Sequence, residues 1–152
     1  MLNFSLRMMK RGVIFFWALW LTIVFLTNFF ESLKAMGIIG EGWTFASGNY
    51  GFMQFVTEVH NTPAFIVTIL FAGVVIWQAV GAFLFWRAWA AFQGIPEGLA
   101  EVDTAFTFSI ALWAAFMIAD EIFLAYDVQG THMAIFMAQL ITLLAIRLLP
   151  DS

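Results

Sequence analysis

The 152-residue chain has no cysteine, which excludes disulfide bonds, thiolate metal sites and thiol chemistry. Charge is also scarce, because only 11% of residues are charged, against about 25% in an ordinary soluble domain. The net charge of −4 provides no basic surface for nucleic acid, so no nucleic-acid partner is expected. Hydrophobic residues make up 63% of the chain. A small globule cannot bury that much apolar surface, so we expect membrane lipids around it, including bound lipid.

One stretch, from Thr104 to Tyr126, shows the pattern most clearly. It carries no charge as far as Ala119, and Asp120 and Glu121 follow at once. A helix of roughly 16 residues rises ~24 Å at about 1.5 Å per residue, which is most of a hydrocarbon core of roughly 30 Å. The two acids therefore lie near the level where lipid tails meet head groups. A charge at that level is usually turned toward protein or water.

Four apolar stretches predict membrane spans, near residues 12–30, 62–86, 104–126 and 131–149. Between the first two lies an outer loop, 31–61, that is rich in glycine and aromatic residues and in which Tyr50–His60 is expected to form a short surface helix. A tight turn is expected at Asp127–Gly130. The predicted fold is all-α: a single membrane domain over residues 1–152, built as an integral membrane antiparallel four-helix bundle.

Basic residues set the expected orientation. On this topology one side of the membrane holds five of them and the other side holds Lys34 alone. The positive-inside rule then predicts that both termini are cytoplasmic. The basic start and apolar run resemble a signal peptide, but no small-x-small cleavage site follows, so we interpret the run as a retained span. We expect a multi-pass protein of a bacterial inner (plasma) membrane. The five residues are Arg7, Lys10, Arg11, Arg87 and Arg147.

The same topology brings both histidines and six of the ten carboxylates to the outer level. Histidine and carboxylate ligands suit a transition metal, and a histidine pair can ligate haem axially or hydrogen-bond to a quinone. His60 and His132 are therefore candidate cofactor ligands. The Glu-x-x-His motif of di-metal bundles is absent, and acids and histidines also mark the water boundary of any span. The candidate metal ligands are Glu31, Glu58, His60, Glu121 and His132; Asp120 and Asp127 lie at the same level.

Polar residues within the spans are few. Asn28, Gln78 and Gln139 are expected to form hydrogen bonds between helices. No Lys or Arg lies near the predicted bilayer centre, and an ion pump or a carrier of charged substrates usually needs one. Transport is therefore disfavoured.

The residues Asp120–Tyr126, followed by Gln129, Phe136 and an apolar tail ending in Pro150-Asp151, resemble a family of small predicted integral membrane proteins with four spans and no assigned function. Asn28 at the end of the first span and His60 before the second also fit that pattern. The last loop departs from it, because here the loop is shorter and lacks a tryptophan. The resemblance implies the four-span fold and no particular chemistry.

Two functions fit these features. The first is a non-enzymatic accessory subunit of a larger respiratory or photosynthetic membrane complex, with other membrane subunits as partners, because the chain consists of spans and short loops without a soluble catalytic domain. The second is a redox protein that binds a metal, haem or quinone at its outer face, through the histidines and acids named above.

Overall fold

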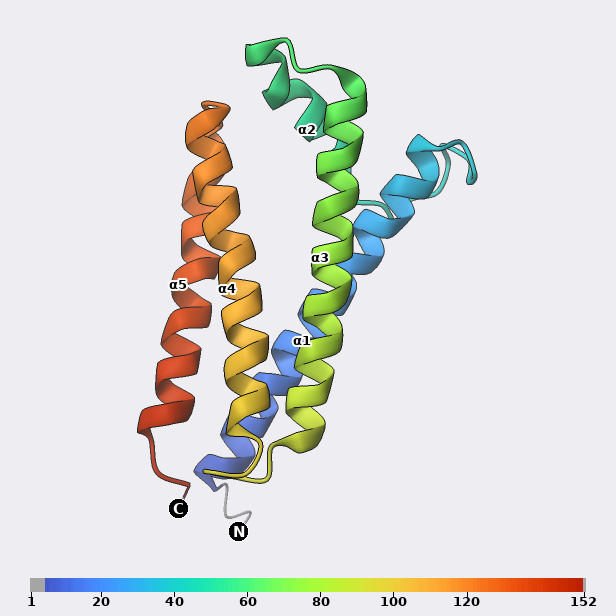
Figure 1. The fold of residues 1–152 in the computed structure, drawn as a ribbon. Helices are drawn as coiled ribbons and strands as arrows, with labels where there is room; N and C mark the ends of the chain where they lie inside the picture. Colours follow the sequence, from blue (N-terminus) through green and yellow to red (C-terminus); the bar gives the residue numbers. More distant parts are fainter. Residues whose placement is uncertain (1–4, 152) are drawn as a thin grey trace.

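The computed structural model describes residues 5–151, and within them the protein is all-helical (Figure 1). Four of its five α-helices are long and apolar enough to cross a membrane, as the sequence predicts. The short surface helix predicted at Tyr50–His60 is also confirmed, as α2 and the 3-10 turn η1. The elements are α1 (Leu6–Ala35), α2 (Asn49–Thr57), η1 (Glu58–His60), α3 (Ala64–Ala91), α4 (Leu99–Ile122) and α5 (Tyr126–Leu148).

The long helices pack in the order α1, α3, α4, α5, and both termini lie at the same end of the molecule (Figure 1). The hydrophobic core is concentrated at that end, around Phe85, Phe92 and Phe106, which are each 0% exposed. Toward the opposite end α1 leans away from α3, and both lie apart from the pair α4–α5 (Figure 1). The bundle is therefore tightly packed near its termini and less so at its other end.

Helices α1 and α3 approach closely where Gly81 faces Leu21. A Cβ atom at Gly81 would lie 2.8 Å from Leu21 Cδ2, so a larger residue there would displace that side chain. Gly73 is also in α3, but a Cβ there would meet nothing within 4 Å. Of the two glycines in this helix, only Gly81 is required by helix packing.

The last two helices are joined by a turn over Phe123–Ala125. Leu124 has a left-handed backbone, with φ of 55°, and Ala125 N donates to Asp120 O at 2.8 Å. This hydrogen bond belongs to a Schellman motif, in which glycine usually occupies the left-handed position. The turn predicted at Asp127–Gly130 is wrong, because those residues form the first turns of α5. The true turn has no glycine, so the sequence carries no obvious mark of it.

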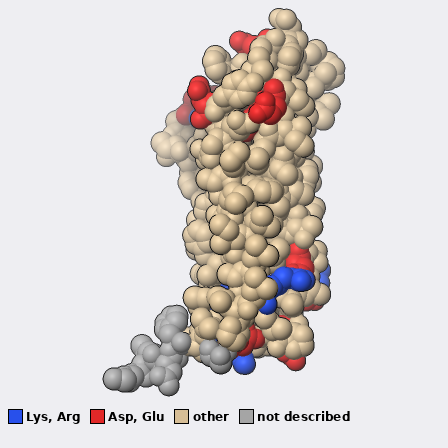
Figure 2. All heavy atoms as spheres, turned by 90° about the vertical axis from the view of Figure 1, so that its left-hand side faces the viewer, with Lys and Arg blue, Asp and Glu red and all other residues tan. Residues whose placement is uncertain are grey.

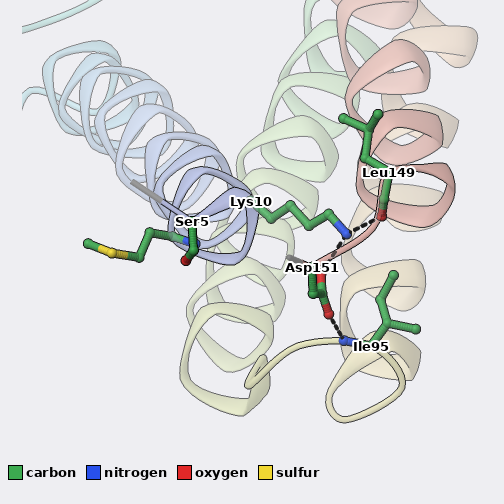
Figure 3. A network of polar contacts seen from close by, with 6 residues as sticks. Ser5, Lys10, Ile95, Leu149 and Asp151 are labelled. Carbon is green, nitrogen blue, oxygen red and sulfur yellow. Dashed lines mark hydrogen bonds and ion pairs between the residues drawn. The ribbon is translucent and has the colours of Figure 1, made fainter. Parts of the chain in front are cut away.

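A buried lysine ties the C-terminal tail to the helices at the end that holds the termini (Figure 3). Lys10 is 1% exposed, and its Nζ donates to Leu149 O and to Asp151 Oδ1, both at 2.6 Å. The second Asp151 oxygen accepts a hydrogen bond from Ile95 N in the α3–α4 loop. Three segments distant in sequence therefore meet at one ion pair. The hydrogen bond from Lys10, together with that from Ile95, holds the pKa of Asp151 below its ordinary value.

We expect Asp151→Asn to lower the melting temperature of the detergent-purified protein at pH 7, because buried Lys10 loses its counter-charge, at a cost of about 1–3 kcal/mol. The folded-state pKa of Asp151 is depressed, so this stabilisation is fully present above its unfolded value of 3.8. It is lost as the pH falls through the lower folded value. Thermal melts across that range measure both effects. Glu41→Gln is the matched control, because the Glu41 side chain is 90% exposed; equal melting curves for the two variants would contradict the expectation.

Candidate functional site

Where the helices spread apart, the protein forms a partly open cavity of about 600 Å³. Its walls come from α1, α2, α3 and α4, the α4–α5 turn and the start of α5. Most of the lining is apolar, and no Lys or Arg is among its described residues. Aromatic side chains form much of the wall: Phe52, Phe71, Trp77, Trp113, Phe116 and Phe123.

One polar group in the wall is a hydrogen-bonded pair that joins α4 to α5. Asp120 is only 5% exposed, and its Oδ2 lies 2.7 Å from His132 Nδ1. Without a partner a buried carboxylate is costly, so His132 offsets that cost. The His132 ring also stacks on Phe116, with centroids 4.9 Å apart and 22° between the planes. The carboxylate holds the Nδ1 proton, which leaves Nε2 as the ring atom available to a further partner.

A second polar group, a pair of amides, joins α1 to α3. Asn28 and Gln78 are each 2% exposed, and Asn28 Nδ2 donates to Gln78 Oε1 at 2.8 Å. Asn28 Oδ1 accepts from Ser47 Oγ at 2.6 Å and from Asn49 Nδ2 at 2.9 Å. Within residues 5–151 the Nε2 of Gln78 makes no hydrogen bond, and Gln78 lines the cavity. This pair therefore offers a donor that nothing in the described protein uses.

The outer loop completes the wall beside these amides. Gly48 N donates to Glu31 Oε2 at 3.1 Å, and Ser47 N donates to Thr27 O at 3.2 Å. Both bonds hold the end of the loop against the last turns of α1. Glu31 thus positions the loop residues that contact Asn28.

The two histidines lie at the same end of the bundle, as the sequence analysis predicts. His60 Nε2 is 2.6 Å from Ile122 O, and its ring lies 5.8 Å from that of Phe123. His132 contacts Asp120, two residues before Ile122. Both imidazoles therefore contact the last turn of α4, but only His132 lines the cavity.

The five candidate metal ligands are not brought together. Glu31 holds Gly48, Glu121 accepts a hydrogen bond from Gln129 at 2.5 Å, and Glu58 is exposed on η1. Within the described part of the chain, no group of three or more His, Cys, Asp or Glu side chains could hold a metal ion. The acid that does pair with a histidine is Asp120.

The predicted hydrogen bonds of the polar residues in the spans are confirmed. Asn28 bonds to Gln78, and Gln139 Nε2 donates to Ser109 Oγ at 2.9 Å. Only the first pair lines the cavity. In the sequence both pairs look like ordinary helix contacts, so no sequence signal marks Gln78 as a cavity residue.

Four long apolar helices in an all-helical bundle are the pattern of a multi-pass membrane protein. Comparison with protein-family models, with curated proteins and with solved structures finds no match to this chain. The resemblance to the four-span family stays a prediction.

The contact between Asp120 and His132 leads to a spectroscopic prediction. In ¹⁵N-histidine NMR of the detergent-purified protein, we expect His132 Nδ1 to be protonated, because Asp120 accepts its proton. Asp120→Leu removes the acceptor, so the preference of the His132 proton for Nδ1 should be lost. The His60 signals should stay unchanged, because that ring contacts Ile122 O. A wild-type His132 without a proton on Nδ1 would contradict the arrangement.

Proposed function

We propose that this protein crosses a bacterial inner membrane four times, as an antiparallel bundle with both termini in the cytoplasm, and binds an amphipathic small molecule in its non-cytoplasmic half. The orientation is supported by the basic residues that gather near the termini. Arg11 lies over the Trp89 ring, and Arg147 pairs with Asp103, at the end that holds Lys10. On the face drawn in Figure 2, Lys and Arg lie toward one end only, whereas acidic side chains lie at both ends.

The cavity is the observation that carries the binding function. Ligand sites are typically concave, mostly apolar and about 300–1,000 Å³ in volume, with a few convergent polar groups. This cavity has about 600 Å³, an aromatic wall and two polar pairs, Asp120–His132 and Asn28–Gln78. An apolar body would lie among the aromatic rings while a polar head meets the two pairs.

Among the cofactors considered from the sequence, the geometry favours a small organic molecule. A metal site would need more ligands than the described residues bring together. A haem with two histidine ligands would need His60, whose Nε2 is engaged with Ile122 O and whose side chain does not line the cavity. An organic amphiphile such as a quinone requires neither condition.

A second candidate function, an accessory subunit of a larger membrane complex, is favoured by helix α5. In the most apolar 18-residue stretch of α5, only 11% is buried inside the protein, against 28–33% in the corresponding stretches of the other three long helices. Its exposed apolar residues recur every three or four positions and so form one stripe, which a partner helix in the membrane would cover. The stripe consists of Met133, Met137, Ile141, Leu144 and Leu148.

Topology is testable directly, because the chain has no cysteine to replace. We expect Glu41→Cys in the outer loop to react with a membrane-impermeant maleimide on intact cells. Glu97→Cys, in the α3–α4 loop, should react only after permeabilisation. Both positions are exposed. The reverse pattern would place the cavity in the cytoplasmic half.

Binding is testable by filling the cavity. Ala115 lines it, so we expect Ala115→Phe to occupy ligand space and weaken binding by roughly tenfold or more, equivalent to about 1.4 kcal/mol. Ala111→Phe is the control, because Ala111 is an exposed position on the same helix that does not line the cavity. Mass spectrometry of solvent extracts from the purified proteins measures the bound amphiphile. Equal amounts in both variants and the wild type would contradict the proposal.

A further inference from the structure

Resting on the binding function proposed above, we propose that the head group bound in the cavity is a quinone ring, held through one carbonyl by Gln78 and through the opposite carbonyl by His132. The two polar pairs leave a hydrogen-bonding group unused at each wall, and aromatic side chains line the cavity.

At the α1–α3 wall, the protein offers a donor without an acceptor. Asn28 Nδ2 donates a hydrogen bond to Gln78 Oε1, and Asn28 Oδ1 already accepts two hydrogen bonds, from Ser47 and Asn49. Gln78 lines the cavity, and among the described residues its Nε2 has no hydrogen-bond partner. A ligand with an acceptor oxygen at this wall would accept a hydrogen bond from that donor, so it would be bound most favourably.

At the α4–α5 wall, the protein offers a group that can either donate or accept. Asp120 holds His132 through Nδ1, so Nε2 is the atom left for a ligand. In the imidazolium form Nε2 donates to a carbonyl, and in the neutral form it accepts from a hydroxyl. A quinone presents a carbonyl there, and its reduced form presents a hydroxyl. His132 therefore suits both forms of the same ring, while Gln78 contacts an oxygen in either form.

The surface between the two walls suits a flat ring. His132 stacks on Phe116 and lies 5.8 Å from the Trp113 ring, so aromatic faces adjoin the polar atom. Trp77 also lines the cavity, and its Nε1 is engaged with Phe108 O at 3.1 Å, which leaves its ring as apolar wall. Aromatic side chains favour a planar partner, by offset or edge-to-face packing.

Other membrane amphiphiles fit less well. A phospholipid phosphate would want Lys or Arg, and neither is among the described residues of the lining. A fatty-acid carboxylate would lie beside the Asp120 carboxylate, and like charges repel. A sterol has a single hydroxyl and would leave one of the two polar walls without a partner.

The test uses the full-length protein, purified in mild detergent and stripped of bound lipid. The probe is a benzoquinone that carries one isoprenoid unit, and its binding is followed by quenching of tryptophan fluorescence. We expect Gln78→Leu and His132→Asn each to weaken binding roughly fivefold to tenfold, since each removes one hydrogen bond to a buried group. Gln54→Leu, at an exposed position outside the cavity, should bind as the wild type does.

The chemistry of the head group is tested by analogues and by infrared spectroscopy. A phenol with the same isoprenoid tail has one ring oxygen, so it should bind the wild type more weakly than the quinone does. Its affinity should also be lowered by only one of the two substitutions, Gln78→Leu or His132→Asn. If Gln78→Leu does not fold, infrared spectroscopy of the quinone bound to the wild-type protein still tests whether both carbonyls accept hydrogen bonds. With ¹³C at one carbonyl, both C=O bands should lie below their frequencies in hydrocarbon solvent.

Two kinds of failure are distinguishable. If neither the quinone, oleate, cholesterol nor phosphatidylglycerol binds, and Ala115→Phe changes nothing, the binding function itself is refuted. If oleate, cholesterol or phosphatidylglycerol binds more tightly than the quinone, the inference fails and the binding function stands. The inference also fails, and the binding function stands, if the quinone binds but neither Gln78→Leu nor His132→Asn weakens its binding. Unshifted carbonyl bands of the bound quinone would have the same meaning.

Discussion

The pairing of Asp120 with His132 is the interaction on which the half of this protein that holds the cavity depends. A carboxylate that is 5% exposed at the end of an apolar helix needs a partner, and the imidazole lies 2.7 Å away on the next helix. The pair joins α4 to α5 just beyond the turn that connects them. It also orients the His132 ring against Phe116, so that one polar nitrogen is left beside an aromatic wall. A single hydrogen-bonded pair thus contributes both to the packing of two helices and to the chemistry of the cavity.

The two ends of the bundle differ in what holds them. Near the termini, Phe85 and Phe106 pack edge to face with centroids 4.9 Å apart. Lys10 ties the tail to α1, and Asp151 in that tail binds the α3–α4 loop. At the other end the helices spread apart, and hydrogen bonds from the loop and η1 connect them (Figure 1). A molecule built this way keeps its helices together at one end while it keeps a cavity at the other. Binding sites between helices of bundles commonly have this character.

The amide pair shows how a loop can complete a site made by helices. Asn28 lies on α1 and Gln78 on α3, yet the acceptor capacity of Asn28 is taken up by Ser47 and Asn49 from the loop and the start of α2. Because those two residues occupy the Asn28 oxygen, the free atom at this wall is a donor on Gln78. The loop therefore decides which hydrogen-bonding group the cavity presents, although Ser47 and Asn49 look unremarkable in the sequence.

The amino-acid sequence by itself determined the all-helical class, the number of long apolar helices, the short helix in the outer loop and the hydrogen bonding of Asn28, Gln78 and Gln139. These follow from hydrophobic runs and from the cost of an unpaired polar group in lipid, which act locally along the chain. Tertiary structure alone decided that Asp120 pairs with His132, that His60 bonds to Ile122 O instead of facing the cavity, and that the proposed metal ligands stay apart. It also placed the last turn at Leu124. Those outcomes depend on how helices rotate and diverge, which is set by side-chain packing between segments far apart in the sequence and leaves no periodic pattern in any one of them.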